Sequence, residues 1–328
     1  MRAVYINNFG GIDDLELREL ADPPAPEREQ VLIRVRAAGL NRADLLQARG
    51  LYPPPEGYSP NVPGLEFAGE VMEIGSGASR WKTGDRVFGI TAGEAQAEML
   101  MIDESLLAKI PEKLNFAEAA AVPEAFITAH DAIFTLGGLE AADRLLIHAV
   151  GSGVGLAGLQ LAKAKGSFVI GTSRTSDKLD QCREFGLDVA ITIDGEINFA
   201  ERVKTITDRE GANVILDLVG AAYFQQNLES MAVNGRLVLV GLTSGVTAEF
   251  NLGIALRKRL KIIGTVLRSR TNEEKADAVA KFADEVVPLF ENGSVKPNLD
   301  HVYSFVEVHE AYKYLESNRS FGKVVLEF

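Results

Sequence analysis

The sequence predicts an α/β protein in which a barrel-like, mostly β domain is combined with a domain built on a doubly wound parallel sheet. Three features support this prediction. Over residues 1–122, short segments that alternate apolar and polar positions are separated by turns rich in glycine and proline. Over residues 123–266, continuous apolar runs alternate with helical segments, as in a parallel sheet covered on both faces. Residues 267–328 end in a β-rich tail that we expect to rejoin the first domain.

The first domain is therefore expected to comprise residues 1–122 with 267–328, and the second domain residues 123–266. In the first, alternation predicts strands, because one face of an antiparallel sheet is buried and the other faces water. These strands are residues 3–6, 15–20, 31–37, 67–74, 86–90 and 95–102. Two alanine-rich helices, 116–122 and 125–134, are separated by Pro123 and lead into the second domain.

The second domain is organised around a strand, turn, helix and strand at residues 144–173. Residues 153–158 read GVGLAG and match the GxGxxG pattern of dinucleotide-binding loops, with an apolar strand before them and a helix after them. Glycine suits such a loop because a Cβ would keep the backbone away from a pyrophosphate, which the N–H groups of the helix start can bind. The alternative is a glycine-rich turn in an ordinary α/β enzyme.

The end of the second strand of this unit indicates which dinucleotide binds. NAD sites place Asp or Glu about 20 residues after the first glycine, where it holds the ribose hydroxyls. Here that position is Ser173, followed by Arg174 and, one turn later, Lys178. No carboxylate repels a 2′-phosphate and two cations can pair with it, so the sequence favours NADPH. The alternative is that both cations are surface charges at a helix start.

The remaining elements follow the same alternation. Strands are expected at residues 188–193, 214–219, 237–241 and 261–265, and helices at 199–207 and 222–231. A long helix is expected at 272–292, and the tail strands at 301–305 and 324–328.

Composition limits the class of protein. The 328 residues carry a net charge of −12, which argues against binding nucleic acid or an anionic membrane surface. A single cysteine, Cys182, excludes a disulfide framework. We see no signal peptide and no apolar run of membrane-span length, so we expect a soluble, cytoplasmic protein.

Local motifs resemble those of the medium-chain dehydrogenase/reductase superfamily. These are residues 63–71 (PGLEFAGEV), 84–87 (GDRV) and Gln160 after the glycine loop. Residues 40–46 (LNRADLL), 50–53 (GLYP), 123–129 (PEAFITA) and 267–270 (LRSR) are similar to the zinc-free NADPH:quinone oxidoreductases, with the damage-inducible enzymes of animals and their bacterial counterparts as the nearest group. The resemblance covers nearly the whole chain. It implies a GroES-like catalytic domain and a Rossmann domain that binds NADPH.

The residues argue against a metal site. Catalytic zinc needs three ligands from Cys, His, Asp or Glu around an open position. Zinc-dependent relatives have Cys and His where this chain has Asn41 and Leu65, which leaves Glu66 alone. The four histidines, at positions 130, 148, 301 and 309, show no ligand spacing. We expect no metal, and therefore hydride donation to an electron-poor acceptor such as a quinone.

The resemblance implies an acceptor pocket floored by Asn41, Asp44 and Tyr52. The Tyr52 phenol could stabilise an enolate or quinol oxygen, or it could simply pack against the prolines that follow it. Asp44 is expected to bond backbone or cofactor rather than to act as a base, and no catalytic acid is evident, so solvent would supply the proton. The implied cofactor contacts are Asn41, Leu45, Thr128, Ser152, Gly153, Val154, Ser173, Arg174, Lys178, Val219, Gly241, Leu242, Thr243, Val266, Leu267 and Arg268. Relatives often have Tyr at Ile193, so one usual NADPH contact is missing.

Two further functions stay open from the sequence: an enone or enoyl-thioester reductase, and an NADPH-binding protein without enzymatic activity. The strand at 261–265 is expected to lie at the edge of the sheet, where pairing with its copy would form a homodimer, as the resemblance also implies. The alternative is a monomer whose edge is shielded by the basic run at 257–259.

Overall fold

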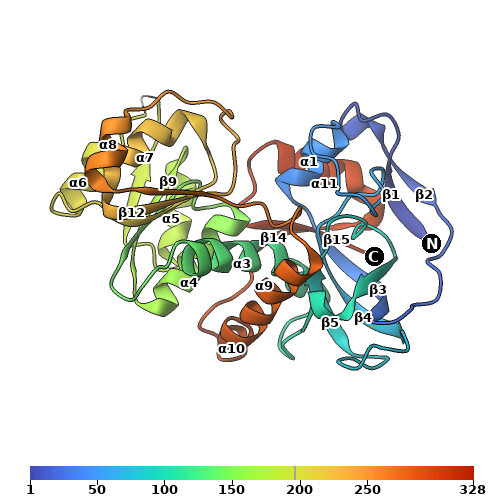
Figure 1. Ribbon diagram of the computed structural model, residues 1–328. Coiled ribbons are helices and arrows are strands. Elements are labelled where there is room, and N and C mark those ends of the chain that lie inside the picture. The colour runs from blue at the N-terminus through green and yellow to red at the C-terminus, as the bar shows by residue number, and fades with distance from the viewer. Residues whose placement is uncertain (196) are drawn as a thin grey trace. The chain divides into compact units, whose positions relative to one another are not determined.

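The computed structural model describes residues 1–195 and 197–328. The chain forms two compact units (Figure 1). Unit 1 comprises residues 1–127 and 267–328, and unit 2 comprises residues 128–266. The first border falls inside helix α3 (Pro123–His130), whereas the sequence placed it before that helix. The assignment of the two units to catalysis and to cofactor binding stays a prediction.

Unit 2 contains a six-stranded sheet in the order β10-β9-β8-β11-β12-β13, and every neighbouring pair is parallel. This is the doubly wound order in which the chain runs outward from a central strand in both directions. The expected parallel sheet is confirmed. Its strands are β8 (Arg144–Ile147), β9 (Phe168–Ser173), β10 (Val189–Thr192), β11 (Ala212–Asp217), β12 (Met231–Leu239) and β13 (Lys261–Gly264).

The helices that connect these strands are α4 (Gly153–Lys165), α5 (Ser176–Arg183), α6 (Ala200–Ile206), α7 (Phe224–Ser230) and α8 (Leu252–Lys258). Helix α4 begins at the cap Ser152, and Gly166 ends it in a left-handed conformation with φ 87°. Helix α8 was not predicted, and it buries none of its residues.

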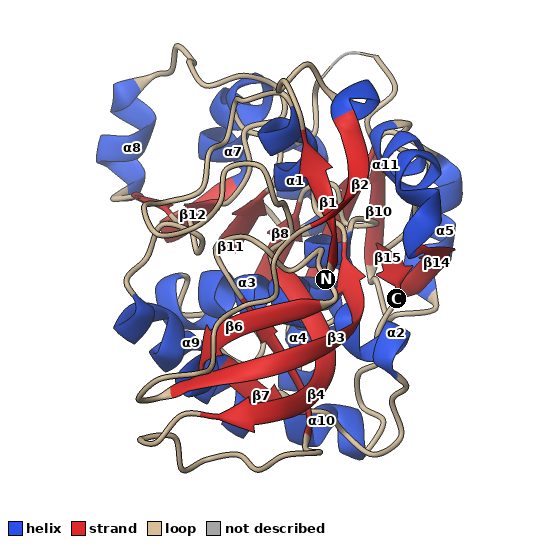
Figure 2. Ribbon diagram, turned by 90° about the vertical axis from the view of Figure 1, so that its right-hand side faces the viewer, coloured by secondary structure: helices blue, strands red, loops and turns tan. Residues whose placement is uncertain are grey.

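Unit 1 contains a seven-stranded sheet in the order β14-β15-β3-β4-β5-β7, with β6 also paired to β3, and a separate two-stranded sheet of β1 and β2. Figure 2 shows β3, β4 and β6 running side by side. The strands are β1 (Arg2–Ile6), β2 (Leu15–Glu19), β3 (Gln30–Gly39), β4 (Glu66–Ile74), β5 (Arg86–Ile90), β6 (Met99–Asp103), β7 (Leu107–Lys109), β14 (Leu299–Ser304) and β15 (Lys323–Glu327).

The C-terminal tail belongs to this sheet, because β15 pairs antiparallel with β3 and parallel with β14. Its expected return to the N-terminal part of the chain is confirmed. Unit 1 also contains helices α1 (Arg42–Ala48), α2 (Phe116–Ala120) and α11 (Val308–Glu316).

Four expected elements were wrong in extent. Strand β12 begins at Met231, well before the expected strand at 237–241. The long helix at 272–292 is two helices, α9 (Asn272–Glu285) and α10 (Val287–Glu291), because Pro288 lacks an N–H and its ring crowds the preceding turn. The segment at 125–134 is α3 followed by a π-helical turn, Asp131–Leu136. The strand at 95–102 begins only at Met99.

Each unit has its own apolar core. In unit 2 the core includes Ile170 and Ile215, which lie on strands of the parallel sheet, and Phe199, which directly precedes α6. In unit 1 one core includes Ile33, Phe67 and other residues of the larger sheet. Among residues 1–195 and 197–328, none of the helices has the length and apolar character that crossing a membrane requires.

Candidate functional site

The glycine loop of unit 2 forms a tight turn between β8 and α4. Ser152 caps the helix, and its Oγ accepts a hydrogen bond from the N–H of Gly155 at 3.2 Å. A Cβ on Gly155 would lie 2.6 Å from the Ala149 carbonyl oxygen, so only glycine fits. A Cβ on Gly158 would lie 3.1 Å from Leu216 Cδ2 of β11, a tight contact, so glycine here allows helix and sheet to pack closely. The turn therefore has the geometry that the GxGxxG pattern predicts.

Several residues predicted to bind the cofactor follow the carboxyl ends of neighbouring strands in unit 2. Ser152, Gly153 and Val154 are partly exposed after β8. The exposed Arg174 follows Ser173 at the end of β9, and Lys178 lies in α5. Because the carboxyl ends of parallel strands meet at one edge of the sheet, the structure brings these residues to the same edge.

The loops after β11, β12 and β13 supply the remaining predicted residues of unit 2. Val219 and Gly241 are partly exposed, and Leu242, Thr243 and Val266 are exposed. Thr128 is buried, and its hydroxyl has no hydrogen-bond partner among the described residues, as expected of a group that binds a ligand. Ile193 lies in the apolar core, so its side chain makes no polar contact with a phosphate.

Unit 1 contains a group of charged and polar side chains, the charged cluster, in which Asp44, Glu66 and Lys323 are buried and Asn41 and Glu124 are half-buried. The Lys323 ammonium lies 2.5 Å from Glu66 Oε1 and donates to Asn41 Oδ1 at 2.7 Å. Asn41 Nδ2 donates to Glu66 Oε1 at 2.8 Å, and the backbone N–H of Glu124 donates to Glu66 Oε2 at 2.8 Å. Glu66 is thus neutralised and hydrogen-bonded on both oxygens by its own chain.

The other two carboxyl groups of the charged cluster are held less tightly. Asp44 Oδ2 accepts from the backbone N–H of Asn41 at 2.7 Å, which is one of its expected roles, but Oδ1 has no partner among the described residues. Burial raises the pKa of Asp44 to about 6. Burial and the neighbouring Glu66 charge raise the pKa of Glu124 to about 8. The cluster therefore contains a carboxyl group that carries a proton at neutral pH.

Tyr52 lies against Arg268, whose guanidinium carbon is 4.8 Å from the centre of the phenol ring. Arg268 donates to the carbonyl oxygens of Ala92 at 2.7 Å and Tyr52 at 2.8 Å, and to Gln47 Oε1. Burial raises the pKa of the Tyr52 phenol, although the charge of Arg268 opposes this effect. Arg268, which was predicted to contact the cofactor, is therefore already hydrogen-bonded to residues of unit 1. Arg268 is buried, and so are Leu45 and Leu267, which were also predicted to contact the cofactor.

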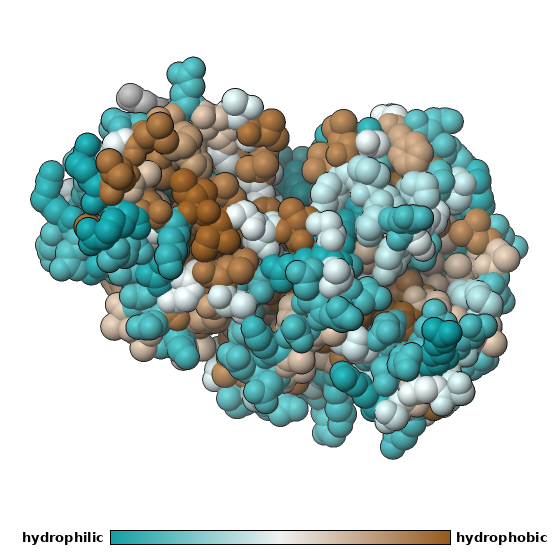
Figure 3. Space-filling view, in the orientation of Figure 1, coloured by the Kyte–Doolittle hydropathy of each residue, from teal (hydrophilic) through white to brown (hydrophobic). Residues whose placement is uncertain are grey.

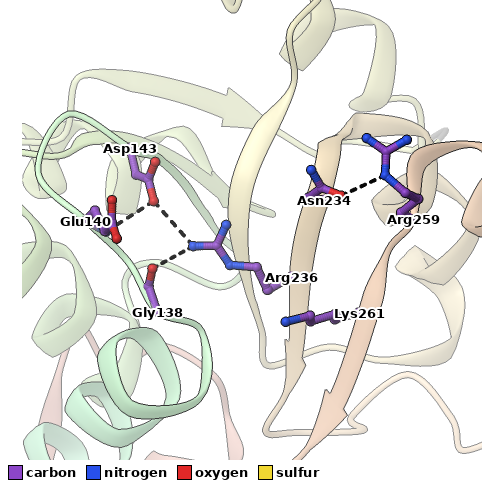
Figure 4. A pocket seen from close by; sticks show the side chains of 7 residues that line it. All are labelled: Gly138, Glu140, Asp143, Asn234, Arg236, Arg259 and Lys261. Carbon is purple, nitrogen blue, oxygen red and sulfur yellow. Dashed lines mark hydrogen bonds and ion pairs between the residues drawn. The ribbon is translucent and has the colours of Figure 1, made fainter.

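A pocket of about 480 Å³ in unit 2 is lined by Gly138, Glu140, Asp143, Asn234, Arg236, Arg259 and Lys261 (Figure 4). Figure 4 shows Arg236 directed at Gly138 and Asp143, to which it donates hydrogen bonds. Arg236 and Lys261 pair in register where β13 begins, so the pocket lies at the amino ends of the strands. Dinucleotides bind at the carboxyl ends of such sheets, and this pocket is therefore not the candidate site.

Sequence reasoning missed Glu124 and Lys323 as members of the charged cluster. Glu124 stands in the quoted motif at 123–129, directly after Pro123, and this position was its only signal. Lys323 gave no signal, because its neighbours Asn41 and Glu66 are distant in the sequence. Within the part of the chain that the structure describes, no three His, Cys, Asp or Glu side chains are placed to hold a metal ion.

Comparisons with known proteins show to which family this architecture belongs. Residues 27–130 match the alcohol dehydrogenase GroES-like domain, and residues 153–284 match the family described as zinc-binding dehydrogenase. The human quinone oxidoreductase is 31% identical over 99% of this chain and 97% of its own length. A quinone oxidoreductase of Pseudomonas aeruginosa is 34% identical, with 97% of each chain covered. The structure of Escherichia coli quinone oxidoreductase complexed with NADPH aligns over 100% of both chains with a TM-score of 0.89 and 29% identity.

A GroES-like domain joined to a doubly wound parallel sheet defines the two-domain dehydrogenase and reductase class. Within that class, the full-length identities show that the chain belongs to the medium-chain dehydrogenase/reductase superfamily, among its quinone oxidoreductases. The expected α/β fold is confirmed by the same comparisons.

Proposed function

We propose that this protein is an NADPH-dependent oxidoreductase that reduces quinones without zinc. The observation that carries the proposal is the charged cluster. Lys323 places an ammonium between Asn41, which stands where zinc-dependent relatives have a cysteine, and Glu66, the one candidate ligand left, and so supplies the positive charge that Glu66 would otherwise share with a metal. A site without a Lewis acid suits acceptors that are already electron-poor.

The residues at the carboxyl edge of the parallel sheet fit a dinucleotide. Ser152, Gly153 and Val154 are partly exposed at the start of α4, and the unpartnered Thr128 hydroxyl offers a polar contact. When bound, NADPH would supply a hydride. Arg174 and Lys178 would hold its 2′-phosphate, and the start of α4 its pyrophosphate. The other proposed contacts are Asn41, Leu45, Ser152, Gly153, Val154, Ser173, Val219, Gly241, Leu242, Thr243, Val266, Leu267 and Arg268.

Among the proposed catalytic residues, Tyr52 would donate a hydrogen bond to the acceptor oxygen as negative charge develops there. Asn41 and Asp44 would position the acceptor, since hydrogen bonds within the charged cluster hold both residues in place. Reduction of a quinone to a neutral quinol consumes one hydride and one proton, and solvent would supply the proton.

Turnover of a simple benzoquinone with NADPH and with NADH tests the proposal. We expect quinone-dependent oxidation of NADPH, a preference over NADH, and no change after prolonged chelation. Absence of turnover with a tightly bound NADPH would favour the non-enzymatic alternative. Faster turnover with an enoyl-thioester or a simple enone than with the quinone would favour the reductase alternative. One zinc per chain by elemental analysis would contradict zinc independence.

We further propose a cytoplasmic homodimer formed through unit 2. Strand β13 is the edge of its sheet, and Ile262 on it is 41% exposed. On α8, Leu252 and Leu256 are 72% and 80% exposed, and Figure 3 shows apolar surface gathered where this helix lies. Pairing with a second copy would cover both features. We expect Ile262→Lys to convert a sedimenting dimer into a monomer, whereas a wild-type monomer at micromolar concentration would contradict the proposal.

A further inference from the structure

A continuous chain of side-chain hydrogen bonds crosses the carboxyl edge of the parallel sheet in unit 2. Its members are Asp217 at the end of β11, Asn227 in α7, His148 directly after β8, and Thr172 in β9. Asn227 Nδ2 donates to Asp217 Oδ2 at 2.9 Å, His148 Nε2 lies 2.6 Å from Asn227 Oδ1, and His148 Nδ1 lies 2.8 Å from Thr172 Oγ1. All four residues are 0% exposed, so no solvent competes for these bonds.

The partners fix the direction of every bond. Asp217 accepts hydrogen bonds from N–H groups alone, so the Asn227 amide must turn its nitrogen toward Asp217 and its oxygen toward His148. His148 Nε2 therefore carries the proton and donates. Burial lowers the pKa of His148, which favours the neutral ring, so Nδ1 accepts from the Thr172 hydroxyl. One donor faces one acceptor at each link.

This chain of bonds connects three of the loops in which cofactor contacts were predicted, those after β8, β9 and β11. Asp217 Oδ1 accepts from the backbone N–H of Val219 at 2.7 Å and of Gly220 at 2.9 Å, which fixes the loop after β11. His148 immediately precedes Ala149, whose φ of 50° is unusual for a residue with a side chain, at the entrance of the glycine loop. Thr172 immediately precedes Ser173 and the loop after β9.

We infer that Asp217, Asn227, His148 and Thr172 form a positioning relay, the carboxyl-end relay, that holds these three loops in the conformation that binds the dinucleotide. This inference rests on the proposed function. The physical reason is preorganisation: loops fixed before binding do not have to be ordered by the ligand, so less of the binding free energy is lost. The relay touches no reacting atom, and its four members are positioning residues.

Thr172→Val tests the relay, because valine keeps the shape of threonine and removes the hydroxyl that donates to His148. We expect the Kd of NADPH and of NADH to rise together by roughly tenfold, the effect of losing one buried hydrogen bond. We expect kcat at saturating NADPH to stay within about twofold of wild type. Thr172→Ser keeps the hydroxyl and should restore both Kd values. A Kd in Thr172→Val equal to that of wild type would overturn the inference.

A matched control separates positioning from general loss of stability. Thr207 is also buried, and its hydroxyl donates to the Val203 carbonyl and accepts from the Gly211 N–H, before β11 begins. Thr207→Val should lower the free energy of unfolding and leave both Kd values unchanged. If Thr207→Val raises the Kd as much as Thr172→Val does, the relay has no specific role.

Hydrogen exchange of the ligand-free protein tests the relay independently of the cofactor. In Thr172→Val, and in Asn227→Leu if that variant folds, the amides of Val150, Val219 and Gly220 should exchange faster, while those of α9 should not. Unchanged exchange at all three amides would overturn the relay. Faster exchange in a protein that binds neither dinucleotide would contradict the proposed function and leave the role in holding the loops intact.

Discussion

The carboxyl-end relay of unit 2 is fully buried and the charged cluster of unit 1 is largely buried, but they differ in how completely their polar atoms are hydrogen-bonded. In the relay, each link joins one donor to one acceptor, and Asp217 accepts three hydrogen bonds. In the charged cluster, Asp44 Oδ1 has no partner within the described part of the chain. Two of the cluster's carboxyl groups also have raised pKa values, about 6 for Asp44 and about 8 for Glu124.

The difference indicates a division of roles. A fully satisfied buried network makes its surroundings rigid, which suits residues that hold loops in place. Unpartnered acceptors and carboxyl groups with raised pKa values cost stability and gather where chemistry takes place. The cluster keeps this unsatisfied character although Lys323 neutralises Glu66 at its centre. Four variants, one of them with two substitutions, test this difference between the two units, from the largest expected effect to the smallest.

Lys323→Met should have the largest effect, because it leaves Glu66 buried without its cation. We expect the free energy of unfolding to fall by about 3–5 kcal/mol, the usual cost of breaking a buried ion pair, in denaturant titrations. The exposed Lys109→Met should change it little. The double variant Glu66→Gln with Lys323→Met should recover much of the loss. A loss no larger than that of Lys109→Met would mean that the pair contributes nothing.

Replacing both Arg174 and Lys178 by alanine should weaken the binding of NADPH by about 1.5–3 kcal/mol in total. Each hydrogen bond to an exposed charged group is expected to contribute at the lower end of the usual range for such bonds. NADH, which lacks the 2′-phosphate, should bind as before. This selectivity contrasts with the relay, whose disruption should weaken both dinucleotides. Arg183→Ala, at the other end of α5, is the matched control and should change neither Kd. Equal losses for NADPH and NADH would refute the assignment of the 2′-phosphate site.

Glu124→Gln should alter how stability depends on pH. In the folded chain the pKa of Glu124 is about 8, against an ordinary value of 4.5 when unfolded. Between these values the folded state holds a proton that the unfolded state has lost, so the free energy of unfolding falls as pH rises. Because the pKa of Asp44 is about 6, Asp44 contributes to this decline mainly below pH 7, and the window from pH 7 to 8 reports chiefly on Glu124.

Denaturant titrations at several pH values measure this effect. We expect a decline in the wild type from pH 6 to 8, a flatter profile in Glu124→Gln, and the wild-type profile in Glu112→Gln, whose side chain is exposed. Parallel profiles for wild type and Glu124→Gln would show that Glu124 loses its proton below this window.

Tyr52→Phe should have the smallest effect. The phenol would donate one neutral hydrogen bond to the acceptor, so we expect kcat for quinone reduction to fall by up to about tenfold, with the KM for NADPH unchanged. Tyr58→Phe, in the same loop region, should leave kcat as it is. If Tyr52 only packs against its neighbours, phenylalanine would serve equally well and kcat would not change.

Much of unit 2 could be predicted from the sequence because its signals are local. Apolar runs, the glycine loop at 153–158 and the stop at Gly166 each act within a few residues, and the parallel sheet followed from their alternation. In unit 1 the expected long helix at 272–292 was wrong, because Pro288 divides it into two helices. Helix α8 was missed because its 7 residues are too few for the apolar positions Leu252, Ala255 and Leu256 to establish a helical period.

The sequence by itself determined the fold class, the glycine loop and the absence of an acid at Ser173, because each depends on neighbouring residues and the backbone conformation they favour. Only the tertiary structure decided which polar side chains meet. Lys323 reaches Asn41 across 282 positions of the chain, and His148 reaches Asn227 across 79. Such contacts form when strands pair and exclude water, and burial then shifts the protonation of groups such as Glu124. Neither step leaves a pattern in the local sequence.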